Sequence, residues 1–141
     1  DYTKPSTEKR FYILDLLQKK LLLSTYVAHG RGSGDNYAVA FSNRPGSYQS
    51  SLGFFRTGDT YMGKNGYSLF LDGLEKGIND KARERAIVVH GANYADPAVL
   101  KGQQRLGRSL GCPALPPDIS KQVIDTIKGG VLLYIYGLNK A

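Results

Sequence analysis

The sequence is poor in the residues that build disulfides, metal centres and membrane spans. It has one cysteine, two histidines and no tryptophan among 141 residues. One cysteine cannot form an internal disulfide. The three best metal ligands, His29, His90 and Cys112, lack the short paired spacing of zinc sites, so we expect no metal and no cofactor. No apolar run approaches the roughly 18 residues of a membrane helix, so we expect no transmembrane segment.

Acidic residues are also scarce. The chain has 19 Lys and Arg against 12 Asp and Glu, a net charge of +7. This excess favours an acidic partner, such as an anionic wall polymer or a membrane surface. The basic residues are scattered and lack the aromatic interleaving of RNA-binding sheets, so we expect no nucleic acid. A length of 141 residues is enough to bury a core in one domain, and we expect a monomer.

Glycine-rich turns between short apolar runs predict a β-rich fold, with a flexible lead-in over residues 1–10 and a single domain over 11–141. Residues 11–16 and 21–27 favour a hairpin, with one helix over 8–23 as the alternative. Further strands are predicted at 37–41, 52–57, 60–62, 67–71, 86–89 and 131–136, the last of them well buried. Residues 29–35 lack the Lys-Ser/Thr ending of a phosphate loop, and we interpret them as a flexible connection in which His29 is structural.

One helix stands out in the C-terminal half. Residues 116–118 can open it with two prolines and an aspartate, and the glycines at 129–130 can end it. Between them, apolar residues recur every four positions, at Ile119, Val123 and Ile127. Asp96 and Pro97 predict a shorter helical turn, as N-cap and first position. Residues 74–85 are polar and indicate an irregular crossing before the strand that ends at His90.

The residues that can carry chemistry are Cys112 and His90. A thiol with a pKa of about 8.5 is mostly protonated at neutral pH, so an efficient thiol nucleophile needs a base or nearby positive charge. His90 follows an apolar run that predicts a buried strand, and Cys112 lies in a turn between Gly111 and Pro113. A thiol and an imidazole are the minimal parts of a cysteine nucleophile with its base, and we predict that they meet in space.

The residues around Cys112 indicate how a substrate could be held. Basic residues outnumber acidic ones between His90 and Cys112, which favours the thiolate and attracts a carboxylate. Arg108 is the candidate for binding that carboxylate. The backbone N–H groups of Gly111 and Cys112 can form an oxyanion hole. Tyr94, close behind His90, can form a wall of the cleft.

The pair His90-Gly91 and the run Ser109-Leu110-Gly111-Cys112 resemble the signature of the L,D-transpeptidase (YkuD-like) catalytic domain. The match is closest to the murein L,D-transpeptidase subfamily that carries VVHGA and RSxGCPALP. The resemblance continues through residues 41–47, 50–53, 63–69 and 73–80, and so covers nearly the whole chain. It implies the β-sandwich or barrel of that family, mainly β with one clear helix, and a single catalytic domain over 11–141.

The resemblance also implies a function. The family acts on peptidoglycan stem peptides, so we expect a protein of the cell envelope, periplasmic or extracellular, whose signal peptide has been removed. Cys112 would attack the bond between an L-centre and the following D-residue, with His90 as general base and the Gly91 carbonyl orienting the histidine. An amine from a second stem would then resolve the acyl-enzyme into a 3–3 cross-link. Arg108 and Ser109 would line the acyl site, and carbapenem-type inhibitors are candidate ligands.

Two alternatives stay open. The same Cys–His pair could use water alone, as an L,D-carboxypeptidase or as an L,D-endopeptidase that cleaves 3–3 links. The domain could also be a catalytically inactive, basic cell-wall-binding module. Many family members carry His or Lys where this chain has Leu110, and Arg or Asn where it has Ala114.

Overall fold

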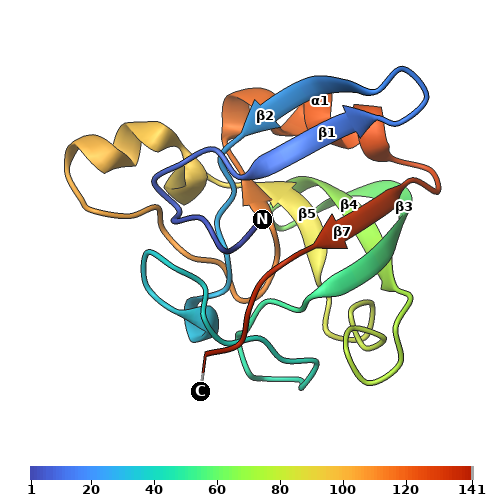
Figure 1. Ribbon diagram of the computed structural model, residues 1–141, viewed down its shortest axis with the longest axis horizontal. Coiled ribbons are helices and arrows are strands. Elements are labelled where there is room, and N and C mark those ends of the chain that lie inside the picture. Colours follow the sequence, from blue (N-terminus) through green and yellow to red (C-terminus); the bar gives the residue numbers. More distant parts are fainter. Residues whose placement is uncertain (141) are drawn as a thin grey trace.

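A computed structural model describes residues 1–140 of the chain (Figure 1). A hairpin forms one small sheet, and a second sheet has five strands in the order β6-β5-β4-β3-β7. The strands are β1 (Phe11–Asp15), β2 (Lys20–Thr25), β3 (Gly53–Gly63), β4 (Gly66–Gly73), β5 (Val88–Gly91), β6 (Ala114–Leu115) and β7 (Leu132–Ile135). The helices are α1 (Pro117–Ile127) and three short 3-10 helices, η1 (Arg31–Ser33), η2 (Asn93–Ala95) and η3 (Pro97–Lys101). The predicted fold class, mainly β with one clear helix, is confirmed.

The β3–β4 hairpin forms the centre of the large sheet. Gly63 pairs with Gly66 across the turn, and Gly66 has the positive φ of +83° that such a turn requires. The sequence predicts two strands, over 52–57 and 60–62. The structure has one strand instead, because the two residues between Thr57 and Thr60 form a bulge in the pairing with β4.

Strand β5 lies between β4 and β6. His90 pairs with Ser68 of β4 on one side and, in parallel register, with Ala114 of β6 on the other. Cys112 precedes Ala114 by two residues, so continuing the same register brings it beside Val88, at the start of β5. The sheet therefore sets Cys112 and His90 on neighbouring segments.

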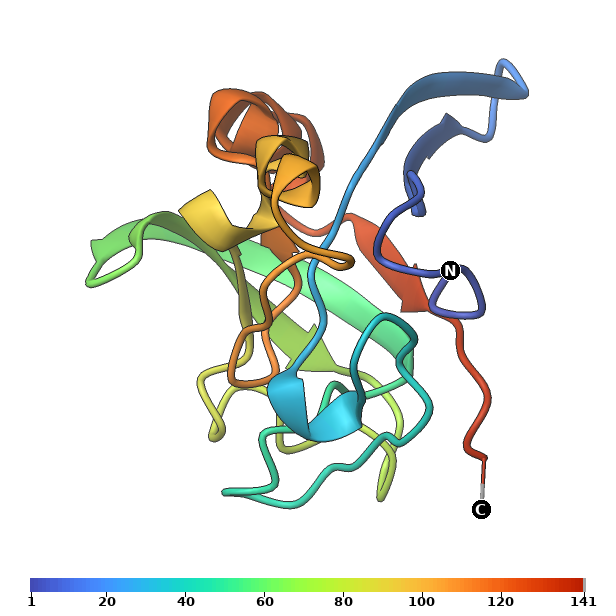
Figure 2. The ribbon, with the colours of Figure 1, turned by 90° about the vertical axis from the view of Figure 1, so that its left-hand side faces the viewer.

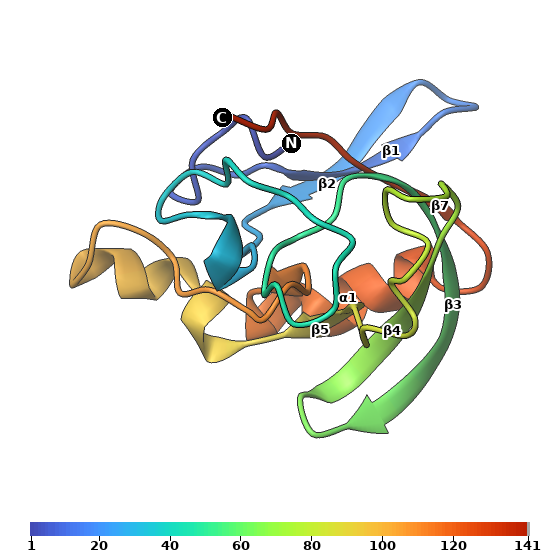
Figure 3. The same cartoon turned by 90° about the horizontal axis from the view of Figure 1, so that it is seen from below.

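Helix α1 packs against β5 and β4 and lies across the large sheet (Figure 3). Its predicted start and its end before the glycines at 129–130 are confirmed. The helix contributes Val123, Ile124 and Ile127 to the buried core, which also includes Phe55, Leu69, Leu71, Val89 and Leu115. The Asp96 side chain accepts a hydrogen bond of 2.9 Å from the Ala98 N–H, which confirms the predicted N-cap of η3.

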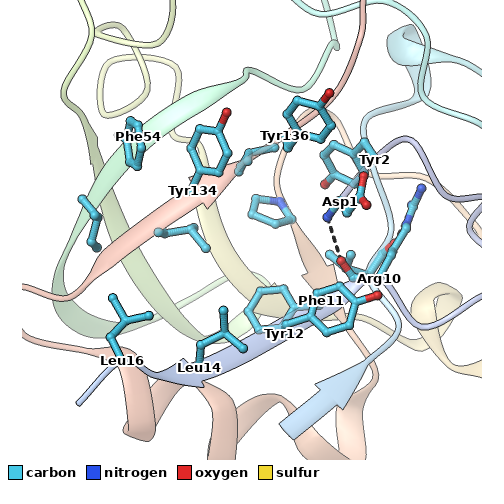
Figure 4. Close-up of a pocket in the computed structure, with 15 residues that line it drawn as sticks. Asp1, Tyr2, Arg10, Phe11, Tyr12, Leu14, Leu16, Phe54, Tyr134 and Tyr136 are labelled. Atoms are coloured by element: carbon cyan, nitrogen blue, oxygen red, sulfur yellow. Dashed lines mark hydrogen bonds between the residues drawn. The ribbon is translucent and has the colours of Figure 1, made fainter. Parts of the chain in front are cut away.

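The β1–β2 hairpin is present as predicted, and the alternative of one helix over 8–23 is wrong. Phe11 and Ile13 are buried, whereas the hairpin tip projects from the body with Leu16 and Leu17 exposed (Figure 2). Between β1 and β7 runs an apolar groove of about 440 Å³ (Figure 4). Leucines of the hairpin form one side of the groove, and the aromatic rings of Phe54, Tyr134 and Tyr136 line the other.

Two strand predictions need correction. Residues 37–41 form no strand within the described part of the chain, because the N–H groups of Val39 and Ala40 both donate to the Ser33 carbonyl. The strand predicted at 131–136 exists as β7 but is not well buried. It is the edge of the large sheet, where Leu132 and Tyr134 stay 60% and 52% exposed.

The first ten residues pack on the body of the molecule. The Tyr2 N–H donates to the Tyr136 carbonyl at 2.7 Å and the Ser6 N–H to the Asn36 carbonyl at 2.8 Å, while the Arg10 side chain is completely buried. This packing differs from the expected flexible lead-in over residues 1–10. Within residues 1–140, none of the helices combines the length and the apolar character needed to cross a bilayer.

Candidate active site

Cys112 is half-buried against the segment that leads into β5. Its Sγ atom accepts a hydrogen bond from the Val88 N–H at 3.4 Å and lies 3.5 Å from the Ala86 carbonyl oxygen, to which it can donate. These contacts fit the continued β5–β6 register. They anchor the thiol two residues from His90 along the same strand.

His90 is buried and has a defined tautomer. Its Nδ1 atom lies 2.9 Å from the Gly91 carbonyl oxygen. A carbonyl can only accept, so Nδ1 carries the proton and Nε2 presents a lone pair. The structure thus pairs His90 with the carbonyl of Gly91, the group that the resemblance implies. A neutral imidazole of this tautomer can accept a proton at Nε2.

Ser109 shapes the turn that carries Cys112. Its hydroxyl donates to the Cys112 carbonyl at 2.6 Å and accepts from the Gly111 N–H at 3.1 Å. Backbone bonds fix the same residue to the glycine-rich segment, from the Ser109 N–H to the His29 carbonyl and from the Arg31 N–H to the Ser109 carbonyl. Ser109 is buried and acts here as a clamp on the turn.

Only one of the two predicted oxyanion-hole donors is free. The Gly111 N–H is bonded to Ser109, whereas the Cys112 N–H has no hydrogen-bond partner within residues 1–140. Gly111 still has a structural requirement for glycine, because its φ is +128° and a Cβ there would meet Ile87 at 2.8 Å. The turn therefore leaves the Cys112 N–H available to a developing oxyanion.

The electrostatic environment of the thiol differs from the expected one. Burial raises the pKa of Cys112 above its ordinary value, although the Val88 N–H and the charges of Arg85 and Lys64 act in the opposite direction. The resting thiol is therefore neutral at pH 7. The expectation that basic residues between 90 and 112 favour the thiolate is wrong, because burial dominates the pKa of Cys112 and the two cations that oppose it lie outside that segment.

Arg108 and Tyr94 were predicted to bind the substrate, and the structure shows what each side chain contacts. The Arg108 guanidinium lies 3.2 Å from both Asp35 Oδ1 and the Gly34 carbonyl, so it is engaged with the glycine-rich segment. Tyr94 is half-buried beside Gly107. Burial raises the pKa of Tyr94 to about 12, and the charge of a Cys112 thiolate acts in the same direction.

His29 and Gly30 belong to a buried connection. Arg10 lies 2.9 Å from His29 Nδ1, and since arginine can only donate, the proton is on Nε2, 3.2 Å from the Gly34 carbonyl. A Cβ on Gly30 would meet the Tyr48 carbonyl oxygen at 2.5 Å and the Gly111 Cα at 2.9 Å. The structural role of His29 fits this packing, but the predicted flexible connection does not.

A polar cavity of about 350 Å³ opens next to the His90 segment. Gly91 at the end of β5 and Lys64 at the β3–β4 turn both line it, together with Asn65, Tyr67, Ala92, Asn93, Pro117 and Ser120. Lys64 also acts electrostatically on Cys112. Lys64 is thus the one residue of the cavity whose charge also acts on the thiol. Within residues 1–140, no group of three His, Cys, Asp or Glu side chains could hold a metal ion.

Sequence reasoning missed Arg85 and Lys64, the two cations that act on Cys112. It counted charges only along the chain between His90 and Cys112, whereas Arg85 precedes β5 and Lys64 lies on the β3–β4 turn. A signal for Arg85 was available, because it directly precedes the apolar run that delivers His90.

The comparisons with known proteins concern the family and the fold of the chain. A family model described as the L,D-transpeptidase catalytic domain matches residues 1–136. The structure is similar to the helical cell shape determining protein Pgp2 from Campylobacter jejuni, with a TM-score of 0.56 and 16% sequence identity over 86% of this chain and 41% of that chain. No curated protein sequence matches the chain.

Two further solved structures show weaker similarity. An L,D-transpeptidase from Mycobacterium smegmatis has a TM-score of 0.49 and 13% identity over 84% of this chain and 50% of that chain. The LD transpeptidase LdtMt1 in complex with imipenem has a TM-score of 0.46 and 15% identity over 84% of this chain and 50% of that chain. The chain thus spans half or less of the length of these proteins. With a family model that covers nearly all of its residues, the chain belongs to the L,D-transpeptidase catalytic domain family.

Proposed function

We propose that this domain is a cysteine acyl-transferase that acts on peptidoglycan stem peptides and forms 3–3 cross-links. One observation carries the proposal: Cys112 lies against the strand that carries His90, and the Gly91 carbonyl holds that imidazole in the tautomer of a base. The family assignment supports the substrate class. A substrate of the cell wall also implies that the domain works in the cell envelope.

In the first half of the reaction, His90 Nε2 takes the proton from the Cys112 thiol as Sγ attacks the carbonyl carbon that precedes the terminal D-residue. The Cys112 N–H donates to the oxyanion of the tetrahedral intermediate. Collapse of the intermediate breaks the C–N bond, and the imidazolium returns its proton to the departing amine. The product is a thioester between Cys112 and the shortened stem.

In the second half, an amine of another stem attacks the thioester while His90 accepts its proton. The thiolate leaves and is reprotonated, so the new amide joins two stems and the enzyme is regenerated. Water in place of the amine would give a trimmed stem. The neutral resting thiol suits this scheme, because its proton is removed only when substrate and His90 are both in place.

The polar cavity beside Gly91 is the candidate binding site for the stem. Its one ionised lining residue is Lys64, a cation suited to a substrate carboxylate. Arg108 stays a second candidate for that role, although it would have to leave Asp35. Ser109 and Tyr94 would act from the acyl side, as clamp and wall. LdtMt1 is known in complex with imipenem, and we extend the proposal to acylation of Cys112 by carbapenems.

The test is release of the terminal D-residue from a tetrapeptide stem by wild type and by Cys112→Ala. The thiol makes only weak contacts, so the variant should keep its unfolding midpoint while release falls to the background rate. Undiminished release by the folded variant would end the proposal.

Mass spectrometry of purified sacculi incubated with the protein separates the alternatives. New 3–3 dimers support transpeptidation. Trimmed tripeptides without dimers indicate a carboxypeptidase, and loss of existing 3–3 dimers indicates an endopeptidase. Binding to sacculi without any product would fit the inactive wall-binding module.

A further inference from the structure

We propose that Arg85 is a positioning residue of this site: it fixes the loop over residues 42–51 beside the turn of Cys112, and it stabilises the thiolate formed when Cys112 loses its proton. The inference deepens the proposed function and rests on it for its catalytic meaning. Its test, however, needs no substrate.

Arg85 lies next to the turn that carries the thiol. It immediately precedes Ala86, whose carbonyl contacts Cys112 Sγ. Its Nη2 atom is 3.5 Å from the position that a Cβ on Gly111 would occupy. The guanidinium therefore lies beside Gly111, the residue that directly precedes Cys112.

The hydrogen bonds of Arg85 go only to neutral groups. Nη1 donates to the Ser42 carbonyl at 2.9 Å and to Ser51 Oγ at 2.8 Å, while Nη2 donates to the Gln49 carbonyl at 2.8 Å and to Ser47 Oγ at 3.2 Å. Within residues 1–140, no carboxylate forms an ion pair with it. A half-buried cation that no carboxylate neutralises lowers the pKa of a nearby acidic group, because it favours the anionic form of that group.

This arrangement contrasts with the other arginines nearby. Arg83, two residues earlier, donates to both oxygens of Asp72 on the surface, at 2.6 and 3.0 Å. Arg108 is paired with Asp35. The loop over 42–51 instead supplies oxygens that satisfy Arg85 without neutralising it, which leaves its charge available to Cys112.

Other titratable groups also face the thiol. Lys64 approaches from the β3–β4 turn, Tyr94 from η2 and Tyr2 from the N-terminal segment, while His90 lies on β5. Lys64 is exposed, so water and salt screen it. Burial raises the pKa of both tyrosines, which are neutral at pH 7. Arg85 is thus the permanent charge that is both close and shielded from solvent.

The experiment measures the alkylation rate of Cys112 by iodoacetamide against pH, since the rate follows the thiolate fraction. In Arg85→Gln the loss of a nearby cation should raise the thiol pKa by about one unit and slow alkylation at pH 7 about tenfold. In Arg85→Lys the charge remains, and most of the wild-type profile should be retained. Arg83→Gln is the matched control and should leave the profile unchanged.

A purely structural role of Arg85 gives a different pattern. The double variant Ser47→Ala/Ser51→Ala removes two of the four hydrogen bonds but keeps the charge, so its alkylation pKa should equal that of wild type. Equal shifts in the Lys and Gln variants, a shift in the serine variant, or no shift in Arg85→Gln would each overturn the inference. If Arg85→Gln does not fold, the Lys and serine variants carry the test. Failure of the proposed function would appear separately, as D-residue release that survives Cys112→Ala.

Discussion

Lowering the pH from 7 to 4 should destabilise this fold through His29. Burial, and then the charge of Arg10, lower the pKa of His29 from 6.5 to about 4 in the folded protein. The unfolded chain therefore takes up a proton below about pH 6.5, whereas the folded protein does so only near pH 4. Stability is fully present above the unfolded pKa and is lost as the pH falls through this window.

The structure sets the size of the effect. A difference of about 2.5 pKa units at 1.36 kcal/mol each corresponds to a loss of about 3 kcal/mol between pH 7 and pH 4. Protonation would put a second cation against Arg10, whose guanidinium now donates to His29 Nδ1 at 2.9 Å. A loss of this size is a large share of the stability of a small domain.

Urea unfolding of wild type and His29→Asn at several pH values isolates this contribution. Asparagine keeps an acceptor for Arg10 and does not titrate, while all other groups titrate in both proteins and largely cancel in the difference. We expect wild type to lose about 3 kcal/mol relative to the variant from pH 7 to pH 4. Parallel stability curves would contradict this expectation and would mean that His29 can be protonated within the fold.

Two substitutions test the packing and the charge of the site. In Gly30→Ala, the new Cβ would meet backbone atoms, including Gly111 Cα at 2.9 Å, so the free energy of unfolding should fall by about 1–3 kcal/mol and the alkylation rate of Cys112 should change. Gly102→Ala is the control, because a Cβ there meets nothing within 4 Å, and its free energy of unfolding should stay within about 0.5 kcal/mol of wild type. Equal effects of the two substitutions would contradict this packing. Lys64→Gln should raise KM for a tetrapeptide with a free carboxylate about threefold, and the increase should be smaller at high salt. Lys76 is exposed and lies outside the cavity, so Lys76→Gln should leave KM unchanged. The same KM in Lys64→Gln and in wild type would show that Lys64 does not bind the substrate.

The local elements were predictable from sequence. The hairpin of β1 and β2, the cap at Asp96 and the limits of α1 depend on residues close together in the chain, so turn and capping chemistry identifies them. The position of His90 in a buried strand was predictable for the same reason, because an apolar run leads directly into it.

Features that depend on distant segments were not predictable. Residues 37–41 have the composition of a strand, but their hydrogen-bond partners lie in loops. Arg10 is charged and near the start of the chain, yet its side chain is completely buried. Its guanidinium is accommodated there because it donates to the Val27 carbonyl and to His29. The position of the Arg85 guanidinium likewise depends on the loop over residues 42–51, whose carbonyl groups accept its hydrogen bonds. Tertiary packing decides each of these cases.

In the proposed reaction, Cys112 carries the acyl group during turnover. The most direct measurement is the intact mass of the protein, acid-quenched during reaction with a tetrapeptide stem, followed by peptide mapping. We expect an added tripeptide acyl group on Cys112 in wild type and none in Cys112→Ala. Turnover with the acyl group on another residue, or turnover that continues without this cysteine, would contradict it.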